Sequence, residues 1–229
     1  MTTLLIATRN AHKVGEIRAI LSGQFRYLTL QDFPAAPNVV EDAATFAGNA
    51  TKKAVELAQW LASSSNLVKA ATAPDFVLAD DSGLEVDALG GAPGVHSARF
   101  ASLDSGKPGN SPDADNNAKL LRLLKDIRAE KLTARFRCVI ALTPVAPEPP
   151  QNASPVCDAN QFELSTELFD GTCEGRILAS PSGAGGFGYD PLFVPDGFSQ
   201  SFAELGNSIK NQLSHRARAL AKLRVRLNG

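Results

Sequence analysis

The start of the chain changes its hydrophobic periodicity over a short stretch, and this change constrains the fold more than any other feature. An apolar run from Thr3 to Ala7 gives way to the polar segment Thr8–Lys13, after which Val14, Ile17 and Leu21 recur at helical spacing. A short apolar run suits a buried strand, and apolar residues three or four apart suit a helix with one buried face. The N-terminus is therefore predicted to form a strand, a polar loop and a helix.

Three further helices are predicted from the same helical period. An apolar stripe indicates a helix from Phe46 to about Leu61, on which Asn49 and Lys53 share another face. A helix is expected after a polar loop at 102–117, and its apolar residues are Leu120, Leu121 and Leu124. The last helix buries a stripe made of Leu213, Ala217, Leu220, Leu223 and Leu227.

Strand patterns occupy the middle of the chain. A buried strand from Phe76 to Ala79 is expected to end in the turn-forming group at 80–83, and alternating apolar residues predict a half-exposed strand at 134–142 and a partner at 162–168. The segment between these two, 144–157, holds five of the chain's 14 prolines and is predicted to be an extended surface insertion. The short apolar run Leu192–Val194 follows a glycine cluster.

This mixture of helices and strands favours an α/β or α+β domain with two lobes over a regular doubly wound sheet. At 229 residues the chain is long enough for one large domain, predicted to span 1–229. A net charge of −1 argues against electrostatic binding of the whole molecule to nucleic acid or to an anionic membrane. The last 25 residues nevertheless carry only basic charges, on Lys210, Arg216, Arg218, Lys222, Arg224 and Arg226.

The cysteines and the N-terminus bear on the compartment. The three cysteines have no CxxC or Cys/His spacing, so neither a disulfide framework nor a zinc site is indicated. The N-terminal apolar run is too short for a signal sequence, and no stretch approaches the roughly 20 apolar residues of a membrane span. A cytoplasmic, soluble protein is expected.

Two polar segments that follow apolar runs are candidate sites. The loop Thr8–Lys13 precedes a helix, where backbone N–H groups and the Lys13 ammonium could bind an anion, although Thr8 or Asn10 could equally just cap the helix. Asp80 and Asp81 follow an apolar strand and point to opposite sides, so at most one is expected to enter a cleft while the other caps or faces solvent. A metal-bridged phosphate would need such a carboxylate, but the group could also be a structural turn.

Two segments near the C-terminus complete the candidate set. The string Gly185-Gly186-Phe187-Gly188-Tyr189-Asp190-Pro191 would let the backbone approach a ligand and present a ring to a planar base, or it could be a turn with a core aromatic. If Ser214 caps the last helix, His215 and Arg216 fall in its first turn beside an anionic or carbonyl-bearing ligand. Two cations at a helix N-terminus oppose the helix dipole, which points to function.

The order and wording of five strings carry a resemblance over nearly the whole chain. TRNAHK, FAGNATKKA, LADDSGLEVDALGGAPGVHSAR, GGFGYDPLF and the Lys210 to SHR segment occur in that order. Together they resemble the inosine/xanthosine triphosphate pyrophosphatase family. The resemblance implies a Mg²⁺-dependent hydrolase that converts ITP, dITP or XTP to the monophosphate and pyrophosphate. It also implies a long mixed, twisted sheet with two lobes, helices around them and the substrate in a cleft between the lobes, and a homodimer.

The resemblance also assigns site residues. Lys53 matches the catalytic-site lysine, and Asp81 matches the proton acceptor and metal ligand. The phosphate-binding segment is matched by Thr8, Arg9, Asn10, Ala11, His12 and Lys13. The other substrate contacts are matched by Ser82, Phe187, Gly188, Tyr189, Asp190, Lys210, His215 and Arg216.

The residue chemistry suits these roles. Attack of water on the α-phosphorus needs a base near the substrate and positive charge at the leaving pyrophosphate. Asp81 is assigned to the metal and the base, and Lys13, Lys53 and Lys210 to the phosphate charge. Donors such as His215, Arg216 or backbone N–H groups would donate hydrogen bonds to the 6-oxo group of the purine. The 6-amino group of adenine is itself a donor and would be left unpaired.

The stretch before the second helix departs from the family pattern. The family commonly has a pair of acids there and an acid before the helix asparagine, whereas this chain has Val40 at one position and Gly48 at the other. Glu41 is the candidate for the second metal carboxylate, with Asp42 and Asp80 as substitutes.

A second hypothesis is a non-catalytic nucleotide or nucleic-acid binder that uses the basic C-terminal helix. The glycine at position 48 would suit lost catalysis. The Asp81 carboxylate and the three candidate phosphate lysines favour the enzyme, a small-molecule partner and no nucleic acid.

Overall fold

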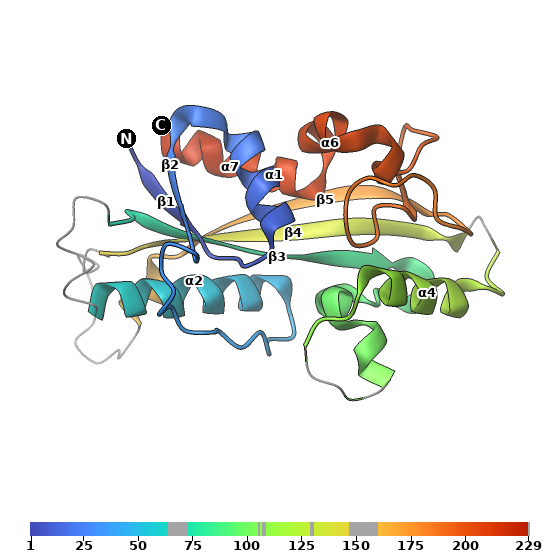
Figure 1. The fold of residues 1–229 in the computed structure, drawn as a ribbon, viewed down its shortest axis with the longest axis horizontal. Helices are drawn as coiled ribbons and strands as arrows, with labels where there is room; N and C mark the ends of the chain where they lie inside the picture. The colour runs from blue at the N-terminus through green and yellow to red at the C-terminus, as the bar shows by residue number, and fades with distance from the viewer. Residues whose placement is uncertain (64–72, 105, 107–108, 129–130, 147–159, 229) are drawn as a thin grey trace. The chain divides into compact units, whose positions relative to one another are not determined.

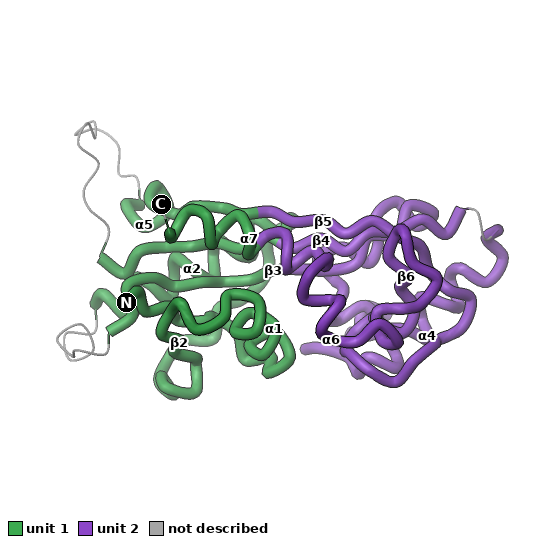
Figure 2. Tube along the Cα trace, turned by 90° about the horizontal axis from the view of Figure 1, so that it is seen from above, with its two compact units in different colours: residues 1–81, 139–169, 220–229 green, residues 82–138, 170–219 purple. Residues whose placement is uncertain are grey.

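The computed structural model describes residues 1–63, 73–104, 106, 109–128, 131–146 and 160–228. Figure 2 shows the two compact units into which the chain divides. Unit 1 comprises residues 1–81, 139–169 and 220–229, and unit 2 comprises residues 82–138 and 170–219. The proline-rich insertion predicted at 144–157 lies for the most part outside the described residues.

In the part of the chain that the structure describes, six strands form one mixed sheet in the order β2-β1-β3-β4-β5-β6 (Figure 1). They are β1 (Thr3–Ile6), β2 (Arg26–Thr29), β3 (Phe76–Val86), β4 (Thr133–Pro144), β5 (Glu167–Ile177) and β6 (Phe193–Pro195). Strand β1 pairs in parallel with β2 and β3, whereas β5 and β6 are antiparallel. The predicted mixed α/β fold is therefore confirmed.

Helices flank the sheet. The α-helices among the described residues are α1 (Ala11–Leu21), α2 (Phe46–Ser63), α4 (Asp113–Leu124), α5 (Gln161–Leu164), α6 (Phe202–Leu213) and α7 (His215–Asn228). Short 3₁₀ helices are η1 (Ser22–Gln24), η2 (Asp87–Leu89), η3 (Gly94–Arg99) and η4 (Ala101–Asp104). The helices predicted after the N-terminal loop and from Phe46 are confirmed. The predicted C-terminal helix is α7, which buries Ala217, Leu220 and Leu223. Leu213 was expected in the same buried stripe but belongs to α6, because the chain leaves the helix at Ser214.

In unit 1, strand β1 lies at the centre of the packing. Its residues Leu4, Leu5 and Ile6 are fully buried, because α1 and α2 lie on opposite faces of the sheet (Figure 1). Helix α2 turns its small and apolar side chains inward, among them Ala50, Ala54, Leu57 and Leu61. Burial of this stripe stabilises α2 and fixes which of its polar residues face β3.

In unit 2, the aromatic ring of Phe136 on β4 is central to the core. Its ring centroid lies 4.7 Å from that of Phe193 and 6.1 Å from that of Phe202. Strand β4 buries Ala134, Phe136 and Cys138 in alternation, as its sequence period predicts. Ser201 and Glu204 form a capping box that begins α6, so the first orphan N–H groups of that helix are satisfied.

The structure corrects the end predicted for β3. The strand was expected to stop at Ala79, yet it continues through Asp80, Asp81 and Ser82 to Val86. The turn-forming tendency of these residues is overridden because both aspartates find partners on the flanking helices of unit 1. The acidic pair therefore lies within a strand and not at its end.

Two other expectations are also wrong in part. The partner strand predicted at 162–168 begins only at Glu167, because the side chain of Asn160 accepts from Phe162 N and starts the short helix α5. The polar loop predicted at 102–117 ends earlier, since α4 begins at Asp113. Acidic residues in the first turn of α4 favour its start there.

Candidate functional site

The polar loop Thr8–Lys13 is organised by its own side chains. The amide oxygen Oδ1 of Asn10 accepts from His12 N at 2.9 Å and from Lys13 N at 3.2 Å, and Thr8 Oγ1 accepts from Asn10 N at 3.1 Å. The capping role of Asn10 uses two of the N–H groups that an anion could otherwise bind. Side chains therefore carry the positive charge of this loop, and those of Arg9 and His12 belong to exposed residues.

The two adjacent aspartates of β3 face opposite sides of the strand in unit 1. The Lys13 ammonium on α1 donates to the Asp80 carboxylate, and Asn49 Nδ2 on α2 donates to Asp81 Oδ2 at 3.0 Å. Both aspartates are buried. The expectation that one of them caps or faces solvent is therefore wrong, because a helix supplies a polar partner on each face.

Lys53 and Asn49 of α2 assemble a cluster around Asp81. Lys53 Nζ donates to the backbone oxygen of Asp80 at 2.7 Å, and it lies 3.1 Å from Glu41 Oε2 and 3.8 Å from Asp81 Oδ1. Asn49 is fully buried, and its Oδ1 accepts from Ala43 N at 2.9 Å. Asn49 thus fixes both the carboxylate of Asp81 and the segment that carries Glu41.

Asn49 is the residue that the sequence-based site set lacks. The signal was present, since Asn49 and Lys53 are four residues apart and share a helix face. The helical period of the sequence shows that Asn49 and Lys53 share a face of the helix. It does not show that Asp81 of β3 lies opposite this face.

The Asp81 cluster changes the acidity of Asp81. Burial raises the pKa of its carboxyl from 3.8 to about 6, the charges of Lys53 and Lys13 oppose this rise, and the charge of Glu41 adds to it. A carboxyl with a pKa near 6 is ionised at neutral pH and still accepts a proton readily. Asp81 therefore has the acidity of a general base.

The carboxylates of Asp81 and Glu41 are the candidates to hold a magnesium ion. Both lie beside the same lysine ammonium, and their mutual repulsion would be relieved by a cation. Mg²⁺ typically takes one or two protein carboxylates, with water and substrate phosphates as its other ligands. Asp42 is turned to Lys52 at 2.6 Å on the exposed surface, and Asp80 is paired with Lys13. Within the described ranges, no group of three or more His, Cys, Asp or Glu side chains is arranged to hold a metal.

In unit 2, the loop Gly185–Asp190 is shaped by Asp190 and Lys210. Asp190 Oδ2 accepts from Phe187 N at 2.9 Å and from Lys210 Nζ at 2.5 Å. Lys210 Nζ also lies 4.4 Å from the centroid of the Phe187 ring, within the range of a cation–π contact. Gly186 has φ +75°, and a Cβ there would lie 2.2 Å from Asp190 Oδ2, so this approach requires glycine.

Tyr189 ties this loop to two other motifs of unit 2. Its hydroxyl donates to the backbone oxygen of Ser97 at 3.0 Å. The Ser97 hydroxyl accepts from Leu84 N at 2.9 Å and donates to the backbone oxygen of Gly94 at 2.6 Å. Burial and the charge of Asp113 raise the pKa of the Tyr189 hydroxyl, which keeps it protonated as a donor.

The start of α7 places His215 and Arg216. Ser214 Oγ accepts from Ala217 N at 3.2 Å, as expected of the helix cap. The His215 ring stacks on Phe136 at 4.8 Å between centroids. Arg216 is 1% exposed, and its Nη2 donates to Ser82 Oγ at 2.8 Å. Arg216 is therefore held beside the residue that follows Asp81 in β3.

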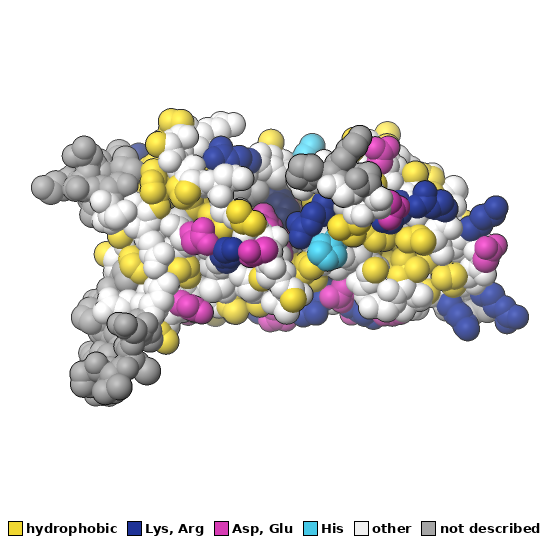
Figure 3. All heavy atoms as spheres, turned by 90° about the horizontal axis from the view of Figure 1, so that it is seen from below, with side chains coloured by type: hydrophobic (Ala, Val, Ile, Leu, Met, Phe, Trp, Pro, Cys, Tyr) yellow, Lys and Arg dark blue, Asp and Glu magenta, His cyan; other side chains and the backbone are white. Residues whose placement is uncertain are grey.

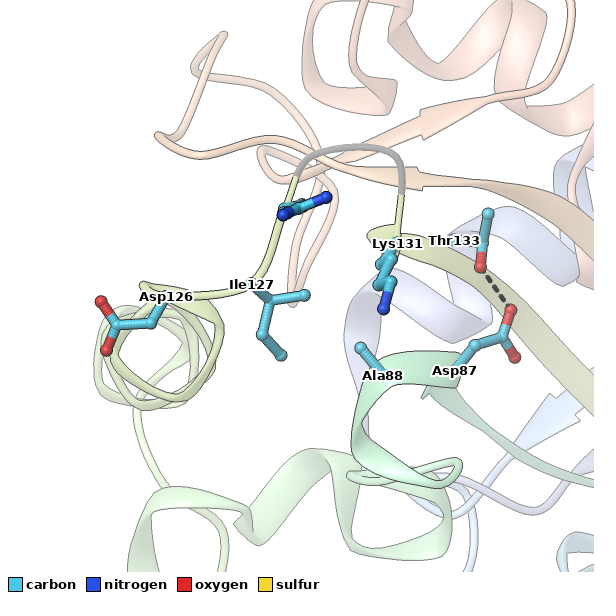
Figure 4. Close-up of a pocket in the computed structure, with 7 residues that line it drawn as sticks. Asp87, Ala88, Asp126, Ile127, Lys131 and Thr133 are labelled. Atoms are coloured by element: carbon cyan, nitrogen blue, oxygen red, sulfur yellow. Dashed lines mark hydrogen bonds between the residues drawn. The ribbon is translucent and has the colours of Figure 1, made fainter.

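A hollow of about 740 Å³ lies elsewhere in unit 2 (Figure 4). It is lined by Asp87, Ala88, Asp126, Ile127, Arg128, Lys131 and Thr133. Figure 4 shows the Thr133 hydroxyl turned to the Asp87 carboxylate, to which it donates at 2.6 Å. None of the candidate site residues lines this hollow, so it is not assigned to the site.

Charges of both signs are interspersed on the face of the molecule drawn in Figure 3. This distribution agrees with the net charge of −1. Among the residues described, no helix is both long enough and apolar enough to span a membrane.

The whole chain is similar to proteins of one family. Residues 4–226 match the Ham1 family. The dITP/XTP pyrophosphatase of Geobacter sulfurreducens is 46% identical over 228 residues, which are 99% of this chain and 97% of the relative. That of Shouchella clausii is 41% identical over 100% of this chain and 98% of the relative. The solved structure of a HAM1 protein from Coxiella burnetii has a TM-score of 0.77 and 31% identity, and the match covers 100% of this chain and 99% of that one.

The raised pKa of Asp81 predicts how the stability of the metal-free protein depends on pH. Because the native carboxyl binds its proton more tightly than the unfolded chain does, the contribution of Asp81 to the unfolding free energy falls as pH rises from 3.8 to about 6. Asp81→Asn removes this contribution. The unfolding free energy of the variant, relative to that of the parent protein, should therefore rise by at most about 3 kcal/mol between acid and neutral pH. Urea unfolding in EDTA across this range measures the difference. Stability curves that stay parallel for the two proteins would show that the pKa is not raised.

Proposed function

Because the chain belongs to the Ham1 family, we propose that it hydrolyses noncanonical purine nucleoside triphosphates, dITP, ITP and XTP, to the monophosphate and pyrophosphate. The observation that carries this proposal is the buried Asp81 carboxylate, which Asn49 and Lys53 hold and whose pKa is near 6. The relatives named dITP/XTP pyrophosphatase, with 41% to 46% identity over nearly the full chain, support the same reaction.

Asp81 acts as the general base in this proposal. Water that attacks the α-phosphorus must lose a proton, and a carboxylate with a pKa near 6 accepts it at neutral pH. Asn49 keeps one oxygen of Asp81 fixed by donating to it. Asp81 and Glu41 would hold Mg²⁺, which supplies positive charge to the phosphate oxygens.

Positive charge for the leaving pyrophosphate comes from unit 1. Lys13 donates to the Asp80 carboxylate and Lys53 donates to the Asp80 backbone oxygen, so both ammonium groups lie beside one residue of β3. In the loop Thr8–Lys13, the exposed residue Arg9 adds a further cation, and the exposed His12 adds a side chain that can hydrogen-bond to phosphate. Charge on the departing phosphates is thereby neutralised in a phosphoryl transfer that involves little covalent chemistry by the protein.

Residues of unit 2 recognise the base. The ring of Phe187 stacks on the purine, and Lys210 supports this ring through its ion pair with Asp190, so Lys210 acts on the base loop more than on phosphate. The N–H groups of Phe187 and Gly188 already donate to Asp190 and Asp113. Donors to the 6-oxo group are therefore assigned to the side chains of His215 and Arg216, while Ser82 contacts the substrate beside Asp81.

The family resemblance also supports a homodimer in the cytoplasm. Two residues of the basic C-terminal helix are engaged within their own units, since Arg226 pairs with Glu167 at 2.8 Å and Arg218 donates to the Thr172 backbone oxygen at 2.7 Å. These contacts favour a solvated, structural face of α7 over a surface that binds nucleic acid.

A substrate panel tests the function. With Mg²⁺, pyrophosphate release from ITP, dITP and XTP should exceed that from ATP and GTP by at least about tenfold, a factor within the reach of one unpaired polar group. Asp81→Asn should lower kcat by a factor on the order of 10² to 10⁴, as expected for loss of a general base. Asp42→Asn, which changes an exposed acid near the cluster, is the matched control. Equal rates on ITP and ATP, or full activity of Asp81→Asn, would refute the proposal.

Metal binding tests the assignment of Glu41. Titration calorimetry with Mg²⁺ or Mn²⁺, without nucleotide, should show at least roughly tenfold weaker binding by Glu41→Gln, since even outer-shell partners of a metal contribute that much. Asp42→Asn should bind as the parent protein does. Weaker binding by Asp42→Asn, with Glu41→Gln unchanged, would move the second carboxylate to Asp42.

A further inference from the structure

Helix α4 of unit 2 binds both backbone polar groups of one residue in the base loop, Gly188. Asp113 Oδ2 accepts from Gly188 N at 2.6 Å, and Asn117 Nδ2 donates to the Gly188 backbone oxygen at 3.1 Å. The two side chains are four residues apart on α4, so they lie one above the other on one face. A single helix thus holds Gly188 through its N–H and its C=O.

The held residue has an unusual backbone conformation. Gly188 has φ +62°, in the left-handed region that favours glycine, although a Cβ there would meet no atom within 4 Å. The conformation, not a lack of space, therefore requires glycine at this position. A glycine linker is also the part of a loop with the greatest conformational freedom, so contacts to its peptide have a large effect on the geometry of its neighbours.

The neighbour that matters is Phe187. Its N–H is bound by Asp190, and the Lys210 ammonium lies over its ring. Contacts from α4 fix the loop on the C-terminal side of this ring, so the ring is held from both ends of its residue. Asp113 and Asn117 belong to none of the strings that carry the family resemblance, and neither is among the predicted contacts.

Only the donor of the Asn117 side-chain amide is hydrogen-bonded among the described residues. Its Oδ1 is buried and, among the described residues, has no hydrogen-bond partner. Leaving an acceptor unsatisfied costs about 1–3 kcal/mol. The side-chain amide of Asn117 therefore uses its donor, in the hydrogen bond to the Gly188 backbone oxygen, and not its acceptor.

We propose that Asp113 and Asn117 are positioning residues that orient Phe187 for stacking on a purine base, and thereby set the affinity for the nucleotide without contact with the reacting phosphorus. This role rests on the proposed function, in which Phe187 contacts the base. The ligand class is a planar purine nucleotide. A loop that is no longer held by α4 samples more conformations, and each substrate must then select the stacked one.

Steady-state kinetics with ITP test the role. Asp113→Ala and Asn117→Ala should each raise KM roughly three- to tenfold, the factor for one hydrogen bond, with kcat within about twofold of the parent. Asp113→Asn keeps an oxygen that can accept from Gly188 N, so it should restore KM. Asp115→Ala is the matched control, because it removes another acid from the first turn of α4 whose side chain makes no hydrogen bond to the loop among the described residues.

Hydrogen exchange of the Gly188 amide, without nucleotide, provides a readout that catalysis does not affect. Protection of this amide should fall in Asp113→Ala and stay in Asp113→Asn and Asp115→Ala, while amides of β4 keep their protection and show that each variant is folded. If the parent protein is active, the positioning role alone is overturned by either of two results. One is an unchanged KM in Asp113→Ala, and the other is an equal change of KM in Asp115→Ala. A parent protein that does not turn over ITP overturns the proposed function, and with it the role in base binding.

Discussion

The buried ammonium of Lys53 is the interaction on which the Asp81 cluster depends. A lysine that is 8% exposed loses most of its hydration, so its charge must be matched by nearby oxygens. Here three groups supply them, namely the backbone oxygen of Asp80 and the carboxylates of Glu41 and Asp81. Because these groups come from β3 and from the segment before α2, one cation fixes the geometry of both. Lys53 therefore determines where the carboxylates of Glu41 and Asp81 lie.

In unit 2, a buried lysine likewise pairs with an acid, at the loop Gly185–Asp190. Lys210 is 2% exposed and is matched by Asp190, which is equally inaccessible. The remaining surface of its ammonium lies near the rings of Phe187 and Phe202, at 4.4 and 5.7 Å from their centroids. In each unit a buried lysine is thus neutralised by a carboxylate from a candidate motif. The acids of these motifs are held in place before any ligand binds, which lowers the entropic cost of binding.

Local patterns predicted the parts of this structure that local interactions decide. The helical period predicted the position of α2. The helix cap at Ser214 and the alternating burial along β4 were also predicted from the sequence. Contacts between distant segments decided the rest. Nothing in the group Asp80-Asp81-Ser82-Gly83 shows that Lys13 and Asn49 will pair with it and keep it in β3. In the same way, the alternation at 162–168 could not show that Asn160 caps a helical turn there.

In the proposed reaction, the Asp81 cluster directs water to the α-phosphorus of a purine nucleoside triphosphate. Hydrolysis of ITP in water enriched in ¹⁸O, followed by mass spectrometry of both products, tests it most directly. Incorporation of the label into IMP, with unlabelled pyrophosphate, is the predicted result. Label in pyrophosphate, or release of orthophosphate in place of pyrophosphate, would contradict it.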